Sequence, residues 1–580
     1  MARSRIGDPA VLSVDLQGWG APGLSLRYAP SKTWGCQDRR PNPFKDATSS
    51  LGAGLTAYAY FPTSHPGCSI GDKMLRLTRY NILIVCAACL GAYSYGFSYA
   101  VFVTSIGEPG FFSYFELDPT SDYTATLIGA ISGLFCAGAA FGAIIQSYTS
   151  DKYGRRKALA FGGAISVVGS AVVAGSINIP MLFVFRFITG LGVGQLLALV
   201  PLYVAEVAPP HRRGLLSALV GVGFSLGYLS SAWIGYGTYF TTNNTLQWRM
   251  PLCLAPLAPL GLVIVCYWIP ESPRWSVWVG HDAEAWKTIQ KVHHDPNDPR
   301  DAAAYAEFIQ IKRQVAHDKE MKASFVRMFS VPSWRKRTLL AILIMFAVQS
   351  SGYNGITSYL VLVAQSAGMT GAMPLLMYAI YVVIAVFFNF VNAAVIDRVG
   401  RRRMLLIGIV WTGSCLLAAA LLSWKYAGTS HKAGNGAAMF FFMMFGLGLG
   451  LFLDPTQFVW CSEAFPTTIR AKGLTIALFT YFVSTVLYTA PAPKAFANIG
   501  WKFYLVFISC DVVCFAMLYK WLPETGNLTL EEIGKLFGDE VVTHFAQDGN
   551  GLVEVDAMAD FDEKSITTQI EETTTSHSGK

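Results

Sequence analysis

Two copies of one short motif show how this chain is organised. Asp151-Lys-Tyr-Gly-Arg-Arg-Lys157 recurs as Asp397-Arg-Val-Gly-Arg-Arg-Arg403. Each copy lies between two long apolar runs and occupies the same place in its half of the chain. The pattern therefore indicates an internal duplication in which each half carries its own acid followed by a Gly-Arg-Arg turn.

Two further stretches repeat in the same order. The matching residues are Glu206, Pro209, Arg213 and Gly214 with Glu463, Pro466, Arg470 and Gly473, and Pro270-Glu-Ser-Pro-Arg274 with Pro523-Glu-Thr-Gly-Asn527. In membrane proteins built from two homologous halves, the binding site lies between the halves near the bilayer midplane. The repeat therefore predicts a central cavity lined by both halves.

The composition is that of a membrane protein. Hydrophobic residues make up 53% of the 580 residues and charged residues only 14%, against roughly 25% charged residues in soluble domains. About 20 apolar residues form a helix that crosses a bilayer. We therefore predict an all-α membrane protein with twelve transmembrane helices, near residues 80–105, 124–147, 158–177, 180–205, 215–238, 251–270, 338–364, 373–396, 404–424, 437–462, 474–492 and 502–521.

The twelve runs form two six-helix halves, residues 80–270 and 338–521. Residues 271–337 between them are charged, and their periodic segments near 282–294 and 300–322 predict surface helices in a cytosolic central loop.

Both ends of the chain differ from this middle part. Residues 1–79 form a predicted disordered tail: the first 73 are rich in Gly, Pro, Ser and Arg and lack the pattern of a secretory signal. Because Met74 directly precedes the first apolar run, a start at Met74 is an alternative. Residues 522–580 are polar and acidic and are predicted to be an unstructured tail.

The basic residues predict the orientation. The net charge of +7 would suit a nucleic-acid binder, but the Lys and Arg residues cluster in alternate short loops, which is a topology signal. It places those loops and both termini in the cytosol, and we expect a plasma-membrane protein in contact with lipid and not with nucleic acid. The sequon Asn243-Asn244-Thr245 then lies outside, so Asn243 is a predicted glycosylation site.

The repeated acids and arginines predict a gating network. Arginine pairs bidentately with carboxylates, so partly desolvated pairs are expected to hold the two halves together on the inner side and to release when the cavity opens inward. The alternative is that Arg-rich turns only anchor the topology. The candidate gating residues are Asp151, Arg155, Arg156, Glu206, Arg213, Glu271, Arg274, Asp397, Arg401, Arg402, Glu463, Arg470 and Glu524.

The motifs resemble those of the sugar porter family of the major facilitator superfamily, with the fungal hexose and disaccharide carriers closest. The resemblance covers about residues 80–535. It implies the major facilitator fold and transport by alternating access. The stretches that carry it are 151–157, 186–194, 201–209, 270–274, 397–402, 523–525 and 528–533.

The resemblance implies a substrate site in the central cavity, although the family pattern is only partly kept. Span 7 reads Val348-Gln-Ser-Ser-Gly-Tyr-Asn354 and lacks the first Gln of the family pattern, and Gly221 replaces a Gln in span 5. Spans 10 and 11 also depart from the family, reading Asp454-Pro455 and Tyr481-Phe482. The predicted substrate-binding residues are Gln349, Asn354, Tyr359, Asp454, Phe458 and Tyr481, with Phe482 as a further aromatic wall. The departures indicate either a different substrate or a different register in spans 10 and 11.

The residues for energy coupling depart from the family as well. Proton-coupled members carry an Asp in span 1 where this chain has Ser98, so Arg186 of span 4 is retained without that partner. Asp454 is therefore a candidate to pair with Arg186, to take up a proton or to contact a cationic substrate group. The alternative is that Asp454 caps a local helix break before Pro455. Uniport and proton symport both stay open.

Three functions are compatible with these sequence features. We predict a carrier of a sugar, polyol or related small polar organic molecule, with protons as a second candidate solute. A transporter of a non-sugar metabolite on the same scaffold is the alternative, and a nutrient sensor is disfavoured by the short C-terminal tail. An enzyme is not expected, because no nucleophile–base set is present. The sequence also predicts no cofactor and no metal, and we expect a monomer.

Overall fold

The computed structural model describes residues 79–208, 213–293, 302–321, 324–426, 429, 431–466, 468–526, 528 and 530–538. All of its described elements are helices. The helices before the central loop are α2 (Arg79–Ser105), α3 (Pro109–Tyr114), α4 (Asp122–Tyr153), α5 (Arg155–Ala174), α6 (Ile179–Val207), α7 (Arg213–Thr238), α8 (Asn244–Leu254) and α9 (Leu257–Val265).

The remaining helices belong to the central loop, the second half and the tail. They are α10 (Pro273–Val279), α11 (Asp282–His293), α12 (Ala302–Met321), α13 (Phe325–Ser330), α14 (Pro332–Ser350), α15 (Tyr353–Thr357), α16 (Leu360–Ser366), α17 (Met373–Val399), α18 (Arg401–Tyr426), α19 (Lys432–Gly448), the π-helix η2 (Leu449–Leu453), α20 (Asp454–Ala464), α21 (Arg470–Thr489), α22 (Ala492–Ile499), α23 (Lys502–Trp521) and α24 (Leu530–Phe537).

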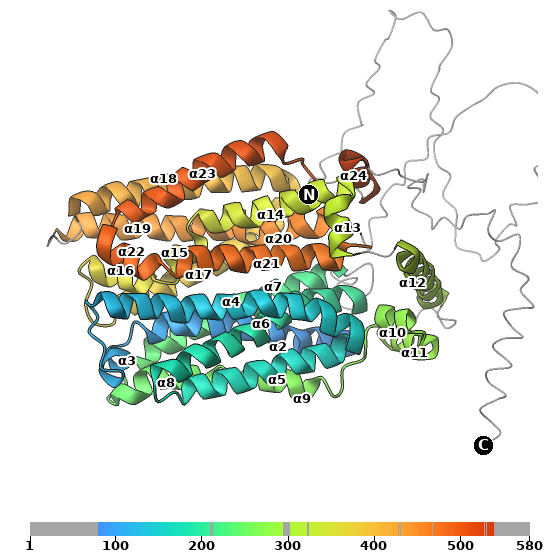
Figure 1. The fold of residues 1–580 in the computed structure, drawn as a ribbon, viewed down its shortest axis with the longest axis horizontal. Helices are drawn as coiled ribbons and strands as arrows, with labels where there is room; N and C mark the ends of the chain where they lie inside the picture. Colours follow the sequence, from blue (N-terminus) through green and yellow to red (C-terminus); the bar gives the residue numbers. More distant parts are fainter. Residues whose placement is uncertain are drawn as a thin grey trace, which may run out of the picture. The chain divides into compact units, whose positions relative to one another are not determined.

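The twelve-helix layout is confirmed. Among the described residues, eleven helical segments are long and apolar enough to cross a membrane, and α7, with 26 residues, completes the set. The helices α2–α9 and α14–α23 form two groups that lie side by side (Figure 1). The groups meet where α4 packs on α21 and where α7 packs on α17.

Small residues bring α4 and α6 close together within the first half. Gly138 and Gly142 of α4 face Gly190 and Gly194 of α6, and a Cβ added at Gly190 would lie 2.0 Å from the carbonyl oxygen of Phe135. In membranes, close approach of helix backbones at such small residues provides the packing that drives helix association.

Several predicted spans are interrupted. The span predicted at 338–364 is three helices, because α14 ends at Ser350 and α15 and α16 follow. The span predicted at 251–270 is divided between α8 and α9, and the span predicted at 437–462 contains η2 between α19 and α20.

Pro455 explains the interruption at η2. Proline has no N–H to donate to the carbonyl four residues earlier, and its ring displaces that carbonyl. Here the carbonyl belongs to Leu451, and Asn392 of α17 donates its Nδ2 to it at 2.7 Å. Asn392 also donates to Thr456 Oγ1 at 3.0 Å. A neighbouring helix thus satisfies the freed backbone group, which membrane proteins require, and Asp454 stands at the start of α20.

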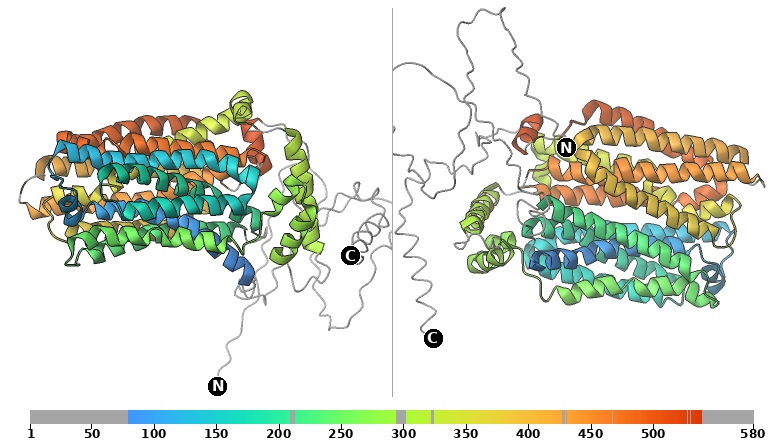
Figure 2. Two further views of the ribbon diagram at one scale, coloured as in Figure 1. Left: turned by 60° about the horizontal axis from the view of Figure 1, so that its bottom comes forward. Right: turned by 180° about the vertical axis from the view of Figure 1, so that it is seen from behind.

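The end of the bundle that carries the Gly154 and Gly400 turns is called the basic end below. The helices α10–α13 and α24 gather there (Figures 1 and 2). Trp275 of α10 donates its Nε1 to the Asp151 carbonyl at 2.9 Å, which fixes the central region beside the α4–α5 turn. The surface helices predicted near 282–294 and 300–322 are confirmed as α11 and α12.

Two boundaries differ from those predicted. The helix α14 already begins at Pro332, inside the expected loop 271–337. The sequence did not indicate this start, because the first turns of α14 carry Arg-Lys-Arg and lack an apolar signal. The unstructured tail expected over 522–580 was wrong for α24. Ile533 and Phe537 of α24 are buried, and Arg337 of α14 lies over the Phe537 ring at 4.8 Å. The predicted tail 1–79 lies outside the described residues except for Arg79, where α2 begins.

Candidate substrate cavity and charge clusters

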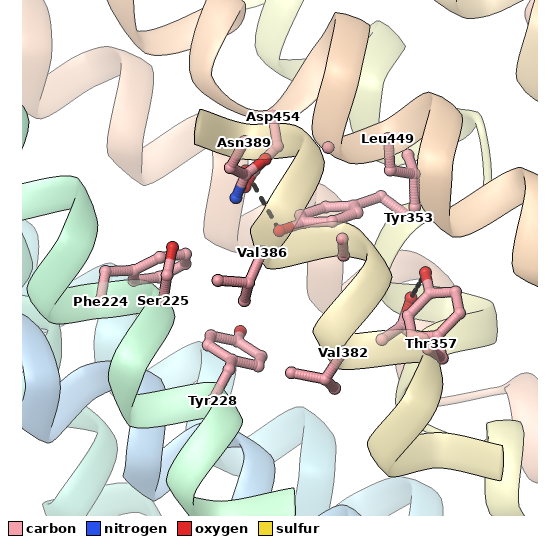
Figure 3. A pocket seen from close by; sticks show the side chains of 13 residues that line it. Phe224, Ser225, Tyr228, Tyr353, Thr357, Val382, Val386, Asn389, Leu449 and Asp454 are labelled. Carbon is pink, nitrogen blue, oxygen red and sulfur yellow. Dashed lines mark hydrogen bonds between the residues drawn. The ribbon is translucent and has the colours of Figure 1, made fainter. Parts of the chain in front are cut away.

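A small cavity with a volume of about 50 Å³ lies between the two halves. The first half contributes α7, and the second half contributes α15, α17, η2 and α20 (Figure 3). The lining residues are Phe224, Ser225, Tyr228, Tyr353, Thr357, Tyr381, Val382, Ala385, Val386, Asn389, Leu449, Gly450 and Asp454.

Asp454 supplies the charge of this cavity. Its side chain is 7% exposed. Tyr353 donates its hydroxyl to Oδ1 at 3.1 Å, and Asn389 donates Nδ2 to Oδ2 at 3.2 Å. The local helix break that the sequence suggested lies directly before this residue. The N-cap of α20 is Leu453 and not Asp454, and the functional role of Asp454 stays a prediction. A carboxylate held by neutral donors at a cavity wall can accept hydrogen bonds from substrate hydroxyls.

Arg186 lies elsewhere, and the pairing of Arg186 with Asp454 was wrong for this structure. Arg186 donates Nη1 to the main-chain carbonyl of Ser98 at 3.0 Å. Its guanidinium lies 4.5 Å from the ring centres of both Phe102 and Phe135. Two aromatic rings and one backbone oxygen thus hold the Arg186 guanidinium in place of a carboxylate.

The amides predicted to bind substrate bond to one another, although Gln349 Nε2 is buried without a partner among the described residues. Asn354 donates Nδ2 to Gln349 Oε1 at 2.9 Å and to the Tyr481 hydroxyl at 3.1 Å. Thr485 also donates to Gln349 Oε1, at 3.2 Å. These residues join α14, α15 and α21 and do not line the cavity between the halves.

Two other predicted substrate residues also lie away from that cavity. Tyr359 donates its hydroxyl to the Thr489 carbonyl at 2.9 Å. Phe458 packs against the Tyr481 ring with 5.9 Å between ring centres. Of the six predicted substrate-binding residues, only Asp454 lines the cavity. Their roles in binding therefore stay predictions.

Sequence reasoning missed most of the lining. Asn389 carried a usable signal, because it is a polar residue inside the apolar run of α17, and polar residues in membrane helices are costly unless they serve a function. Tyr353, Tyr228 and Tyr381 had no such signal, since aromatic residues in membrane helices usually serve packing. Their common position became visible only from the arrangement of α7, α15 and α17.

The first charge cluster closes the basic end of the first half. Arg155 donates Nε to Glu206 Oε2 at 2.9 Å and Nη2 to Glu206 Oε1 at 3.1 Å, a bidentate pair. Asp151 lies 3.5 Å from Arg155 Nη1. Ser272 donates its hydroxyl to Glu206 Oε2 at 2.6 Å. Glu271 accepts from the backbone N–H of Arg155 at 2.7 Å.

The second half repeats this cluster. Arg401 donates Nε to Glu463 Oε2 at 3.1 Å and Nη2 to Glu463 Oε1 at 2.8 Å. Asp397 lies 2.7 Å from Arg401 Nη2. Thr525 takes the place of Ser272 and donates to Glu463 at 3.0 Å, and Glu524 accepts from the backbone N–H of Arg401 at 2.8 Å.

The glycine of each turn makes room for the second acid. Gly154 and Gly400 both have φ +93°, and a Cβ would lie 2.4 Å from Glu271 Oε2 or 2.6 Å from Glu524 Oε2. Each carboxylate can therefore bond to the first N–H groups of α5 or α18, where the helix dipole favours an anion. Burial raises the pKa of the Glu271 carboxyl, although its backbone donors and Arg155 act in the opposite direction.

The geometry corrects the expectation that these pairs tie one half to the other. Among the described residues, the Arg155 and Arg401 pairs both join elements of a single half. At this end, Asp151 of α4 and Lys472 of α21 carry opposite charges on the two halves.

The other candidate gating residues lie near the clusters. Arg156 and Arg402 give backbone N–H groups to Glu271 and Glu524. Arg274 pairs with Asp318 of α12. Arg470 donates Nε to the Phe465 carbonyl at 3.1 Å. Arg213 begins α7, but its side chain lies outside the described part of the chain.

Asn243 is exposed at the start of α8. Its Oδ1 accepts from the backbone N–H of Thr245 at 3.0 Å. This contact leaves Nδ2, the atom that would carry a glycan, free of that hydrogen bond.

The fold and the cavity between the halves define a membrane carrier of the major facilitator type. The inward-open structure of the xylose transporter XylE from E. coli shares the fold, with a TM-score of 0.65, 22% identity, and coverage of 79% of this chain and 99% of that one. The chain belongs to the sugar (and other) transporter family, whose sequence profile matches residues 83–537. The resemblance to the sugar porters is thereby confirmed.

Two curated relatives match over nearly their whole length. The MFS-type transporter criB of Aspergillus cristatus is 30% identical over 472 residues, 80% of this chain and 95% of that protein. The MFS glucose transporter mfs1 of Aspergillus flavus is 27% identical over 486 residues, 79% of this chain and 90% of that protein. The chain is thus a multi-pass membrane carrier and not an enzyme.

Proposed function

We propose that the protein carries a sugar, polyol or related small polar organic molecule across the membrane by alternating access, through the cavity between α7 and α17. The observation that carries this proposal is the buried Asp454 at the wall of that cavity, bonded to Tyr353 and Asn389. The glucose-transporting relative supports the substrate class.

The cavity chemistry suits a small hydroxylated molecule. Asp454 accepts hydrogen bonds from hydroxyls, and Asn389 can donate or accept with its amide. Phe224 and Tyr228 of α7 face them from the other half and offer apolar faces on which a ring can stack. Because both halves contribute, a movement of one against the other would open the site to either side in turn.

The topology is part of the proposal. The basic end faces the cytosol, with both termini and the central loop on that side, and the outer end carries a glycan on Asn243. The protein resides in the plasma membrane as a monomer. Residues 80–270 and 338–521 move as the two halves, and residues 271–337, 1–79 and 522–580 are the cytosolic loop and tails.

The charge clusters form the cytosolic gate. Each cluster holds the basic ends of the helices in its own half as one unit, and Asp151 and Lys472 draw the two units together. Opening toward the cytosol then separates Asp151 from Lys472 while Arg155–Glu206 and Arg401–Glu463 stay paired. The buried pairs thus keep each half rigid during the movement.

Uptake of labelled hexoses, disaccharides and polyols by transporter-deficient cells tests the proposal, with the chain shown to reach the cell surface. Uptake that is lost in Asp454→Asn supports it. With quinate-like acids added to the panel, absence of uptake of every neutral and acidic compound by surface-expressed protein would overturn it. A protonophore separates the two transport modes: uptake that survives it is uniport, and uptake that it abolishes makes Asp454 the candidate proton acceptor in place of the family Asp that Ser98 replaces.

Transport of a non-sugar metabolite is a second candidate. It is favoured by the amide cluster of Gln349 and Asn354, which is bonded internally and leaves the cavity to aromatic groups and one acid. Uptake of an amine or of an acid without hydroxyl groups, with no uptake of any sugar, polyol or hydroxylated acid, would select this candidate.

A further inference from the structure

We propose that Arg186 binds a carboxylate of the transported molecule, so that the substrate is a hydroxylated organic acid. This inference rests on the proposed carrier function and narrows its substrate class. It starts from a charged group that the cavity with Asp454 does not use.

The Arg186 guanidinium is buried without an anion. Its side chain is 3% exposed. Among the described residues, no carboxylate lies within 4.0 Å of it, and its Nε has no hydrogen-bond partner. A guanidinium carries five N–H donors, of which the Ser98 carbonyl takes one at 3.0 Å. A buried cation left without a counter-charge is costly, more so inside a membrane.

Arg249 shows what the same contacts look like when no anion is needed. It too donates to one backbone carbonyl, that of Ser176 at 2.7 Å, and lies over two rings, Tyr114 at 4.6 Å and Trp248 at 5.0 Å. Arg249 is only half-buried, whereas Arg186 is 3% exposed. The Nε of Arg249 is likewise buried without a hydrogen-bond partner, so the difference between the two arginines lies in their overall exposure to water.

A second cavity adjoins Arg186. Tyr99, Phe102, Ser132, Phe135 and Arg186 of the first half line it together with Ser358 of the second half. The Tyr99 hydroxyl bonds to Ser358 Oγ at 2.8 Å. The space is only about 10 Å³, so a carboxylate would enter it as the two halves move apart. It would then meet the guanidinium and hydroxyl donors, and no acidic side chain among the described lining residues.

The two cavities are neighbours. Tyr99 of the second cavity contacts Tyr228 of the first, with 5.8 Å between ring centres. Thr357 lines the first cavity and the next residue, Ser358, lines the second. Asp454 repels a carboxylate and attracts hydroxyl donors, whereas Arg186 attracts the carboxylate. The pair therefore fixes one orientation, with the acid group toward α6 and the hydroxyls toward α20.

Uptake of matched pairs of labelled compounds by transporter-deficient cells tests this inference. The pairs are gluconate with glucose, galacturonate with galactose, and quinate with inositol. The variants are Arg186→Gln, Arg186→Lys and the matched control Arg249→Gln, each compared at equal surface expression.

We expect the wild type to take up at least one acid at least 10-fold faster than its neutral partner. Loss of a charge-assisted pair costs roughly 10- to 100-fold, so Arg186→Gln loses that factor for the acid and the preference disappears. Arg186→Lys retains part of it, because a point charge lacks the planar fork. Arg249→Gln keeps the preference of the wild type. If Arg186→Gln does not reach the surface, the reduced preference of Arg186→Lys carries the test.

Other outcomes overturn the inference in distinguishable ways. If neutral compounds are taken up, and the paired acids are neither taken up at a similar rate nor inhibit that uptake, then Arg186 does not bind a substrate carboxylate. The proposed function still stands in that case. Inhibition of neutral uptake by phosphate or chloride, without uptake of any acid, makes Arg186 a site for an inorganic anion. Failure of the surface-expressed wild type to take up any compound removes the proposed function itself.

Discussion

The basic ends of the two halves are nearly alike, whereas their membrane interiors differ. Arg155 and Arg401 each form a bidentate pair with a glutamate and a second ion pair with the aspartate four residues earlier. In the interior, the first half holds a cation, Arg186, and the second half an anion, Asp454.

The difference shows which positions the duplication left free to change. Each half needs the same rigid turn at its basic end, so the same residues solve the same local problem twice. A substrate is not symmetric, and the two walls of the cavity must offer it different groups. Equivalent variants in the two clusters should therefore have similar effects. Variants in the interior should have effects that differ between the two halves.

The largest effect is expected from breaking the clusters. Arg155→Gln leaves Glu206, whose side chain is 7% exposed, without its partner. Removing one member of a buried pair costs about 3–5 kcal/mol, so we expect a large fall in the thermal midpoint of the purified protein. Arg401→Gln should act in the same direction but less, because the Glu463 side chain is 26% exposed.

Lys157→Gln is the control for this comparison, because Lys157 is exposed and lies two residues after Arg155 in the same helix. Melting curves followed by tryptophan fluorescence in detergent measure all three variants. Equal midpoints for Arg155→Gln and Lys157→Gln would contradict a structural role for the cluster.

Asp454→Asn should reduce transport without weakening the fold. It removes a buried charge but keeps a polar side chain beside Tyr353 and Asn389. We expect uptake to fall roughly 10- to 100-fold, the cost of losing hydrogen bonds to a charged group, and the thermal midpoint to stay equal or rise.

Asp511→Asn gives the matched comparison in the same half. Asp511 of α23 is buried, and neither carboxylate oxygen has a partner among the described residues. It does not line the cavity, so its variant should transport normally. Uptake lost in Asp511→Asn and kept in Asp454→Asn would move the functional acid to α23.

The turn glycines should give similar losses in both halves. Gly154→Ala and Gly400→Ala force a side chain to adopt φ +93° and to meet the carboxylate of Glu271 or Glu524. Strain of this kind costs about 1–3 kcal/mol. Gly280→Ala is the control, since Gly280 has φ +95° but no atom within 4 Å of the added Cβ.

The thermal midpoints of these three variants separate backbone strain from the clash with the acid. The thermal midpoint should fall further in Gly154→Ala and Gly400→Ala than in Gly280→Ala, and this additional fall measures the cost of displacing the carboxylate. An equal fall in all three variants would mean that the repeated acids do not need the space.

One prediction concerns pH and an acid outside the membrane spans. Glu108 lies between α2 and α3, and burial raises the pKa of its carboxyl from 4.5 to about 8. The folded state therefore keeps this proton up to about pH 8, while the unfolded state releases it near pH 4.5. Because the folded state binds more protons in this window, the free energy of unfolding should fall as the pH rises from about 5 to about 8.

Glu108→Gln should flatten this pH dependence by removing the titrating group. Glu116→Gln is the control, because Glu116 is exposed and lies just after α3, in the same connection between α2 and α4. Thermal midpoints measured between pH 5 and pH 8 compare both variants with the wild type. A slope that Glu108→Gln leaves unchanged would assign the pH dependence to another group.

Much of the fold could be predicted from the sequence. Apolar runs of the right length gave the twelve spans, and the repeat gave the two halves. The break before Pro455 was raised only as an alternative, and the breaks at Ser351 and Pro256 were not predicted, because hydropathy averages over a window and does not register a single interrupted hydrogen bond. The helix α24 was missed because its buried face is made by only a few residues of a polar tail.

The candidate site divides in the same way. The acids and arginines of the clusters are contiguous or repeated in the sequence, so pairing between arginines and carboxylates could be predicted. Asp454 was found as a charge in an apolar run. The amides Gln349 and Asn354 were assigned by resemblance, and the structure places them in a cluster bonded to Tyr481 and outside the cavity with Asp454.

The sequence by itself determined the class of molecule, the number of spans and the chemistry of the two basic turns, because those depend on composition, periodicity and local spacing. The tertiary structure alone decided which side chains share a cavity. Tyr228 and Asn389 meet only because α7 packs on α17, and Arg186 is left without an anion only because the helices around it supply rings and a carbonyl. Such contacts depend on how helices pack across the two halves, which no local pattern records.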